Sequence, residues 1–250
     1  MADNQKFASE VIDLPSEGKL YPKDSPIANG KIEIKYMTAR EEDILTSQNL
    51  IKKGIVIDKV LDSLILTSGV KSDDLILGDK NAVMVATRVL AYGPEYECEV
   101  THPVNGAVKK TTFNLADCPF KKLPDGVSEN NFEVTLPISK NKVTFKLLTG
   151  KEESQIIEEL ESSSKLGSEV IPELTTRLRH TITSVNGDDS QKAINNFVNN
   201  LLARDSMHLR KESKKVSPDI ILEQETDFGG ETVKVDIPMT VNFFWPDTQV

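Results

Sequence analysis

Cys98, His102 and Cys118 are the residues whose types and spacing come nearest to a metal site in this sequence. A structural zinc ion takes four ligands, which usually arrive as two closely spaced pairs. Neither cysteine has a second cysteine two residues later, because Val100 and Phe120 stand there. The ligand set is incomplete, so we interpret both cysteines as reduced thiols and predict no metal and no other cofactor.

Gly150 and Lys151 follow a predicted strand and precede a predicted helix, as the end of a phosphate-binding loop does. That loop needs a further glycine where Phe145 stands and a Ser or Thr where Glu152 stands. A carboxylate at the second position repels phosphate, whereas Thr149 and Glu152 together form the Ser/Thr-x-x-Glu capping box of a helix. These residues therefore predict the start of a helix and not a nucleotide site.

The other candidates for acid–base chemistry are histidines and paired carboxylates in helical patterns. His180 and His208 have no serine or cysteine placed beside them by the sequence, although hydrolase triads do assemble from distant residues. Glu158 and Glu159 are typical of a solvated helix face. We expect a protein that is not an enzyme, with a cell-wall hydrolase that uses either histidine as a distant alternative.

The composition limits the class of protein. The chain has 250 residues, of which 38% are hydrophobic, and a net charge of −9. This suits one large domain or two modest ones, and the acidic balance disfavours nucleic acid or an anionic membrane as a partner. The apolar runs are too short to span a bilayer, and residues 1–6 lack the apolar core of a signal peptide. We expect a soluble protein of the cytoplasm, with no membrane, nucleic-acid or small-molecule partner.

Hydrophobic periodicity predicts an α+β fold that is mainly helical. The expected regions are an extended N-terminal arm at 1–30, a strand and helices at 31–95, an inserted antiparallel β module at 96–148, helices at 149–217, and a C-terminal β hairpin with an aromatic tail at 218–250. We expect Asp79 to cap a helix and the C-terminal hairpin to turn at 227–230.

The arm combines helix-breaking prolines with recurring apolar residues. Pro15 and Pro22 prevent a helix, while Leu14, Leu20 and Tyr21 supply apolar side chains. We expect such an irregular segment to lie across a surface. The sequence leaves open whether that surface belongs to the chain itself or to a neighbour.

The tail contains three adjacent aromatic residues, Phe243, Phe244 and Trp245, in a chain whose aromatic content is 6%. Chain termini fray unless something holds them. Burying three large rings contributes several kcal/mol, at roughly 25 cal/mol per Å² of apolar surface. We expect this run to dock on the hairpin at 220–237, with a partner surface as the alternative.

Several stretches of the sequence resemble a known family. They are residues 13–22 (DLPSEGKLYP), 31–45 (KIEIKYMTAREEDIL), 184–188 (SVNGD), 202–206 (LARDS) and 237–246 (IPMTVNFFWP). In this order, across nearly the whole chain, they resemble the baseplate hub proteins of contractile-tailed phages of the T-even type. The resemblance implies a non-enzymatic role in assembling the central hub of the tail baseplate. It also implies other hub or tail proteins as partners, in the virion tail baseplate and in the host cytoplasm during assembly.

The arm and the tail are the most specific parts of this resemblance, so we predict partner contacts there. An arm that becomes ordered on binding loses conformational entropy, which makes a contact specific without making it tight. The predicted contact residues are Leu14, Pro15, Leu20, Tyr21 and Pro22, with Phe243, Phe244 and Trp245 as a second set.

The sequence departs from that family at its cysteines. Many members carry cysteine pairs at the start of the β module and in the C-terminal hairpin, whereas the hairpin turn here, residues 226–229, has none. The family's zinc is therefore not expected in this chain. Two alternatives remain: a hub assembly chaperone that is absent from the mature virion, and a degenerate zinc-ribbon protein that binds nucleic acid.

Overall fold

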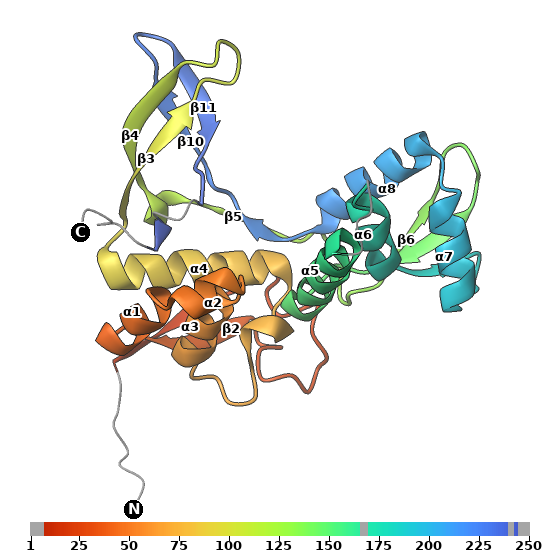
Figure 1. Cartoon of the computed structure of the whole chain (residues 1–250), viewed down its shortest axis with the longest axis horizontal. Coiled ribbons are helices and arrows are strands. Elements are labelled where there is room, and N and C mark those ends of the chain that lie inside the picture. Colours follow the sequence, from red (N-terminus) through yellow and green to blue (C-terminus); the bar gives the residue numbers. More distant parts are fainter. Residues whose placement is uncertain (1–7, 166–169, 240–242, 245–250) are drawn as a thin grey trace, which may run out of the picture.

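The computed structural model describes residues 8–165, 170–239 and 243–244, and Figure 1 shows that they form three parts. The body, residues 8–94, packs a layer of helices beside a small sheet. The hairpin stem, residues 95–118 and 222–239, stands on the long helix of the body. The second lobe, residues 130–165 and 170–217, lies at the other end of that helix.

The body begins with an antiparallel pair of strands and continues into helices. Its elements are β1 (Ser9–Asp13), β2 (Lys31–Lys35), α1 (Ala39–Leu45), α2 (Gln48–Lys52), α3 (Val56–Leu64), the 3-10 turn η1 (Ser72–Asp74) and α4 (Leu77–Tyr92). Ile32 and Ile34 of β2 are buried, as their alternation with charged residues predicts. Thr38 and Glu41 form a capping box at α1, in which the Thr38 amide donates to the Glu41 carboxylate at 3.0 Å.

Two antiparallel hairpins form the stem. They are β3 (Glu95–Thr101) with β4 (Val108–Asn114), followed by the turn η2 (Leu115–Asp117), and β10 (Glu223–Asp227) with β11 (Thr232–Asp236). Although far apart in the sequence, the hairpins are tied together. The Lys109 ammonium donates to the Asp227 carbonyl at 2.5 Å, and the Gln224 amide donates to the Asn114 carbonyl at 2.7 Å. The predicted C-terminal hairpin is confirmed, with its turn between Asp227 and Thr232.

A three-stranded antiparallel sheet and four helices make up the second lobe. Its elements are β6 (Phe132–Thr135), β7 (Lys142–Phe145), β8 (Ile182–Val185), α5 (Gly150–Lys165), α6 (Glu173–Thr181), α7 (Gln191–Asn199) and α8 (Ala203–Val216). Asp205 of α8 accepts hydrogen bonds of 2.9 Å from the amides of both Ile138 and Ser139, so α8 holds the turn between β6 and β7. A short pair, β5 (Phe120–Lys121) and β9 (Asp219–Ile220), connects the stem with this lobe.

The expectation of a mainly helical chain is wrong. The described part of the chain contains eight α-helices and eleven strands, and the strands form five small antiparallel sheets. Two segments interpreted as irregular or helical form strands because each has a partner strand: β1 pairs with β2, and β8 pairs with β7. The β insert expected at 96–148 is also not one module. Its strands are shared between the stem, the short β5–β9 pair and the sheet of the second lobe.

Separate cores stabilise these parts. The body has its own core, and the second lobe buries residues such as Val143, Phe145 and Leu209 between its sheet and helices. A third core lies where the stem meets α1, α3 and α4, and it joins residues from Leu45 to Phe244. None of the helices in the described residues is both long and apolar enough to cross a membrane.

Candidate functional site

The arm is folded against the body by a buried hydrogen-bond network. The Ser16 amide and hydroxyl donate to the Asp79 carboxylate at 2.9 and 2.5 Å, and the Tyr21 hydroxyl donates to it at 2.6 Å. Tyr21 in turn accepts a hydrogen bond of 2.9 Å from the Ile76 amide. Burial raises the pKa of Asp79, although the hydrogen bonds from Ser16 and Tyr21 oppose that shift. Burial and the neighbouring Asp79 charge also raise the pKa of Tyr21.

This network corrects the role expected for Asp79. The helix α4 begins at Leu77, after Ile76, and Asp79 lies in its first turn. Instead of capping the helix from outside, the Asp79 side chain is buried and bonds to the arm. A carboxylate in the first turn of a helix is also favoured by the helix dipole. The helix start and the arm are therefore held by the same side chain.

The part of the arm that the structure describes is compact rather than extended. Its chain reverses so that the Leu14 amide donates to the Gly30 carbonyl at 2.8 Å. Gly18 has φ +75°, and a Cβ there would lie 2.5 Å from the Ala28 carbonyl oxygen. Gly30 has φ +74°, and a Cβ there would lie 2.6 Å from the backbone of Glu17. Only glycine fits both positions without strain.

The predicted contact residues of the arm divide into buried and accessible ones. Leu14, Pro15 and Leu20 are buried, and Leu20 packs with Ile76 and Leu147 where the arm meets the second lobe. Tyr21 is half-buried, and Pro22 is exposed. Partner binding by these residues stays a prediction. On this geometry a partner would touch Pro22 directly, while the others hold the loop that presents it.

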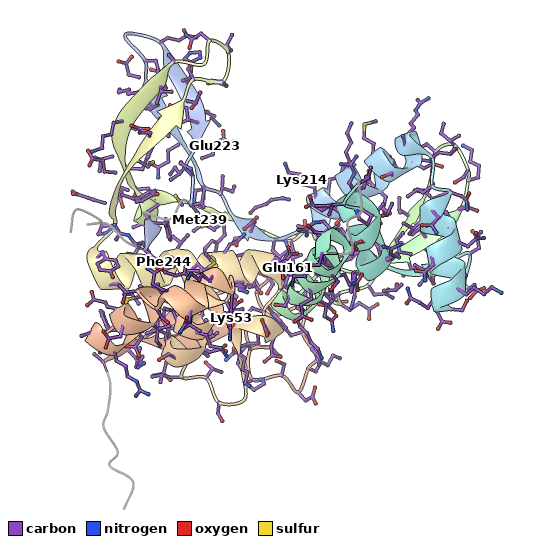
Figure 2. All side chains as sticks on the ribbon, in the orientation of Figure 1. Lys53, Glu161, Lys214, Glu223, Met239 and Phe244 are labelled. Carbon is purple, nitrogen blue, oxygen red and sulfur yellow. The ribbon has the colours of Figure 1, made fainter. Side chains whose placement is uncertain are left out.

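The aromatic tail docks on the chain's own core, which confirms that expectation for the two described residues. Phe243 and Phe244 are 1% and 3% exposed. The rings of Tyr96 and Phe243 lie 5.2 Å apart, edge to face, and Phe244 stacks in the same way on Phe243 at 5.1 Å. Figure 2 shows Phe244 where the stem meets α4. Trp245 lies outside the described residues.

The cysteines lie in the core between the stem and the body. Cys98 and Cys118 are free and buried, and burial raises the pKa of both thiols. Gln224 donates a hydrogen bond to the Cys118 sulfur at 3.4 Å. His102 lies at the tip of the first hairpin, with its ring edge to face on Phe228 at 5.1 Å. Within the residues described, no three side chains of His, Cys, Asp or Glu are grouped so that they could hold a metal ion.

The glycine–lysine segment starts α5, as the capping box predicts. The Thr149 amide donates to the Glu152 carboxylate at 2.8 Å, and Lys146 forms an ion pair with Glu152 at 2.5 Å. Burial opposes ionisation of Glu152, but the hydrogen bonds from Lys146 and Thr149 outweigh it and lower its pKa to about 2. The segment therefore fixes the start of a helix and the direction of β7.

Sequence reasoning also missed a cleft between the body and the second lobe. It has a volume of about 460 Å³ and is lined by the start of α4, the segment after β7, α6, α8 and β9. Leu77, Leu148 and Leu174 supply apolar walls from three of these elements. Arg210 and Lys214 of α8 supply positive charge. Figure 2 shows Lys214 on the side of the second lobe that faces the stem.

One sequence signal could have pointed to this cleft. The segment that forms α8 carries Arg204, Arg210, Lys211, Lys214 and Lys215 in a chain whose net charge is −9. The doubled lysine Lys214-Lys215 predicts solvated surface, and both side chains are exposed. The sequence does not show that Lys214 lines the same cleft as Leu77 and Leu148, because only the tertiary fold brings these residues together.

Together these features define a protein of three small parts, in which the arm packs on the body and the second lobe and the tail packs in the core between the stem and the body. Residues 7–245 match the family model of the T4 bacteriophage base plate protein. The chain therefore belongs to this family and is a T4-like phage baseplate protein, a structural component of the tail that contacts other tail proteins. No curated protein and no solved structure matched the chain.

Proposed function

We propose that this protein is a component of the central hub of the baseplate and takes part in its assembly through contacts with other hub or tail proteins, in the host cytoplasm and then in the virion. The observation that carries the proposal is the family match over residues 7–245, which spans the body, the stem and the second lobe. Residues 13–22 of the arm and 237–246 of the tail resemble hub proteins most specifically. This resemblance supports an assignment to the hub rather than to another part of the baseplate.

The architecture supports a role in placing other proteins. The arm, the stem and the second lobe each present a different surface. Buried contacts join the arm to the body through Ser16 and Asp79, and the arm to the second lobe through Leu20 and Leu147. A component that joins several neighbours needs several surfaces at defined positions. Of the predicted contact residues in the arm, we propose that Pro22, in its exposed loop, touches a partner directly.

Quantitative mass spectrometry of purified virions and of isolated hub complexes tests this proposal. Peptides from this chain should be present in both, in a fixed ratio to the other hub proteins. Presence in assembly intermediates with absence from virions would identify a chaperone instead. Absence from both, while the chain is expressed in the infected cell, would contradict the hub assignment.

A further inference from the structure

The cleft between the body and the second lobe has apolar walls that are open to solvent. Leu174 of α6 is 44% exposed, and the half-buried Leu77 and Leu148 face the same space. The volume of about 460 Å³ lies within the range of about 300–1,000 Å³ in which proteins bind ligand groups. Large apolar side chains of a partner would therefore find room and contact there.

The charge of the cleft is unbalanced. Lys146 and Arg177 also line it, but they are neutralised by Glu152 at 2.5 Å and by Glu153 at 2.7 Å. Arg210 and Lys214 are both exposed. Among the residues that the structure describes, neither has a carboxylate oxygen within 4.0 Å. Two cations thus remain available at one rim.

A third cation lies next to this rim, outside the cleft lining, and the one acidic residue of the lining is Asp219. Lys121 of β5 donates to the Lys214 carbonyl, and burial lowers the pKa of Lys121 while Asp219 and Lys214 act in opposite directions. The Asp219 carboxylate already accepts hydrogen bonds from Asn81 at 3.1 Å and from the Ile220 amide at 2.9 Å. The rim is therefore positive in a chain whose overall charge is −9.

We propose that this cleft binds a peptide segment of another baseplate protein, and that this segment carries both acidic and large apolar side chains. The identity of the partner rests on the proposed function, whereas the chemistry rests on the cleft. Carboxylates would pair with Arg210 and Lys214, the arginine in bidentate geometry, while leucine-like side chains fill the space beside Leu174. Nucleic acid fits less well, because none of the described residues that line the cleft is aromatic and bases would have nothing to stack on.

Fluorescence anisotropy with the full-length chain tests the chemistry directly. The probe is a labelled peptide of about ten alternating leucine and aspartate residues. One control peptide has lysine in place of aspartate, and another has serine in place of leucine. The first peptide should bind at least about tenfold more tightly than either control, a difference of one unit in log Kd. Equal binding of the acidic and the basic peptide would overturn the proposal.

Matched variants of α8 locate the binding. Arg210→Glu with Lys214→Glu reverses two charges in the cleft and should weaken binding of the acidic peptide at least about tenfold. Lys211→Glu with Lys215→Glu makes the same change one residue further on, outside the cleft lining, and should change binding less than about threefold at physiological salt. Thermal unfolding checks that both variants are folded. Equal losses in the two pairs would contradict the cleft as the site.

Two further results distinguish the peptide site from a small-molecule site and from the proposed hub role. Binding of dodecanoate without binding of the acidic peptide would indicate a small-molecule site and would overturn the peptide proposal.

Peptide binding is measured on the isolated chain, so its outcome does not depend on the hub role. A chain that is present in hub complexes but does not bind the peptide would contradict the cleft alone. A chain that binds the peptide but is absent from those complexes would contradict the hub assignment and leave the chemistry of the cleft standing.

Discussion

The hydroxyl of Ser16 donates a 2.5 Å hydrogen bond to the carboxylate of Asp79, 63 residues further along the chain. Both side chains are buried, with exposures of 0%. A buried carboxylate is costly unless donors surround it, and here the Ser16 amide and the Tyr21 hydroxyl complete the set. The arm is therefore a part of the body and not a free extension.

Ser16→Ala should lower the free energy of unfolding by about 1–3 kcal/mol, because Asp79 stays buried and loses a donor. Urea denaturation of the full chain measures this. Ser25→Ala, in the same arm, is the control: Ser25 is only half-buried, and its hydroxyl donates to no described residue. Equal midpoints for Ser16→Ala and wild type would mean that the network does not hold the arm.

Glu41 should make stability depend on acid pH. Its burial favours the neutral form, but hydrogen bonds from Lys35, Ser63 and Thr38 outweigh this and lower its pKa to about 2, from a usual 4.5. Because the folded pKa is depressed, the ionised carboxylate stabilises the fold above pH 4.5. That contribution, up to about 3 kcal/mol, is lost as the pH falls from about 4.5 to about 2.

The variant Glu41→Gln tests this pH dependence. It should be less stable than wild type at pH 7, and the difference should shrink on acidification through the same range. Glu158→Gln, which changes an exposed side chain on α5, should follow wild type at every pH. Urea denaturation at several pH values gives the comparison. A constant difference between Glu41→Gln and wild type would contradict the assigned pKa.

Phe243→Ala should destabilise the fold by about 3–5 kcal/mol, because it removes a fully buried ring from its contacts with Tyr96 and Phe244. Met239 is 39% exposed, and Met239→Ala should cost about 0.5 kcal/mol or less. Thermal unfolding followed by circular dichroism separates the two. A Phe243→Ala protein with an unchanged melting temperature that fails to join hubs would instead place this ring on a partner surface.

Gly78→Ala should destabilise the chain although alanine favours helices. An alanine inside a helix usually gains about 0.5–1 kcal/mol over glycine. Here its Cβ would lie 1.8 Å from the Pro218 carbonyl oxygen, so α4 and the segment before β9 would have to separate. We expect a net loss of about 1–3 kcal/mol. The sign of the change in unfolding free energy decides the matter, since a gain in stability would rule out this close approach.

The sequence predicts local features well because their causes are local. The capping box at Thr149, the strand with alternating Ile32 and Ile34, and the hairpin that turns after Asp227 all depend on neighbouring residues, and the structure contains all three. Asp79 shows the limit of this reasoning. Its position near a helix start is visible in the sequence, but its bonds to the arm are not.

The features that the sequence does not reveal depend on distant partners. Ile182 continues the helical spacing of Leu174 and Leu178, yet it lies in β8, which pairs with the edge of β7. The cleft likewise requires Leu77 of the body and Lys214 of the second lobe to line the same space. Leu14 and Leu20, two of the predicted contact residues, are buried. Their burial results from packing with distant parts of the chain, which composition and periodicity do not encode.

The core between the stem and the body also sets the order in which this protein is completed. The second lobe is continuous in the chain, so it can fold as a unit during synthesis. The core that contains Leu45, Val60 and Tyr96 must wait for Phe243, which the ribosome adds almost two hundred residues after Leu45. Docking of the tail is therefore a late folding event. A chain that stops before Phe243 leaves this apolar surface uncovered, and chaperones and proteases act on proteins in such incompletely folded states.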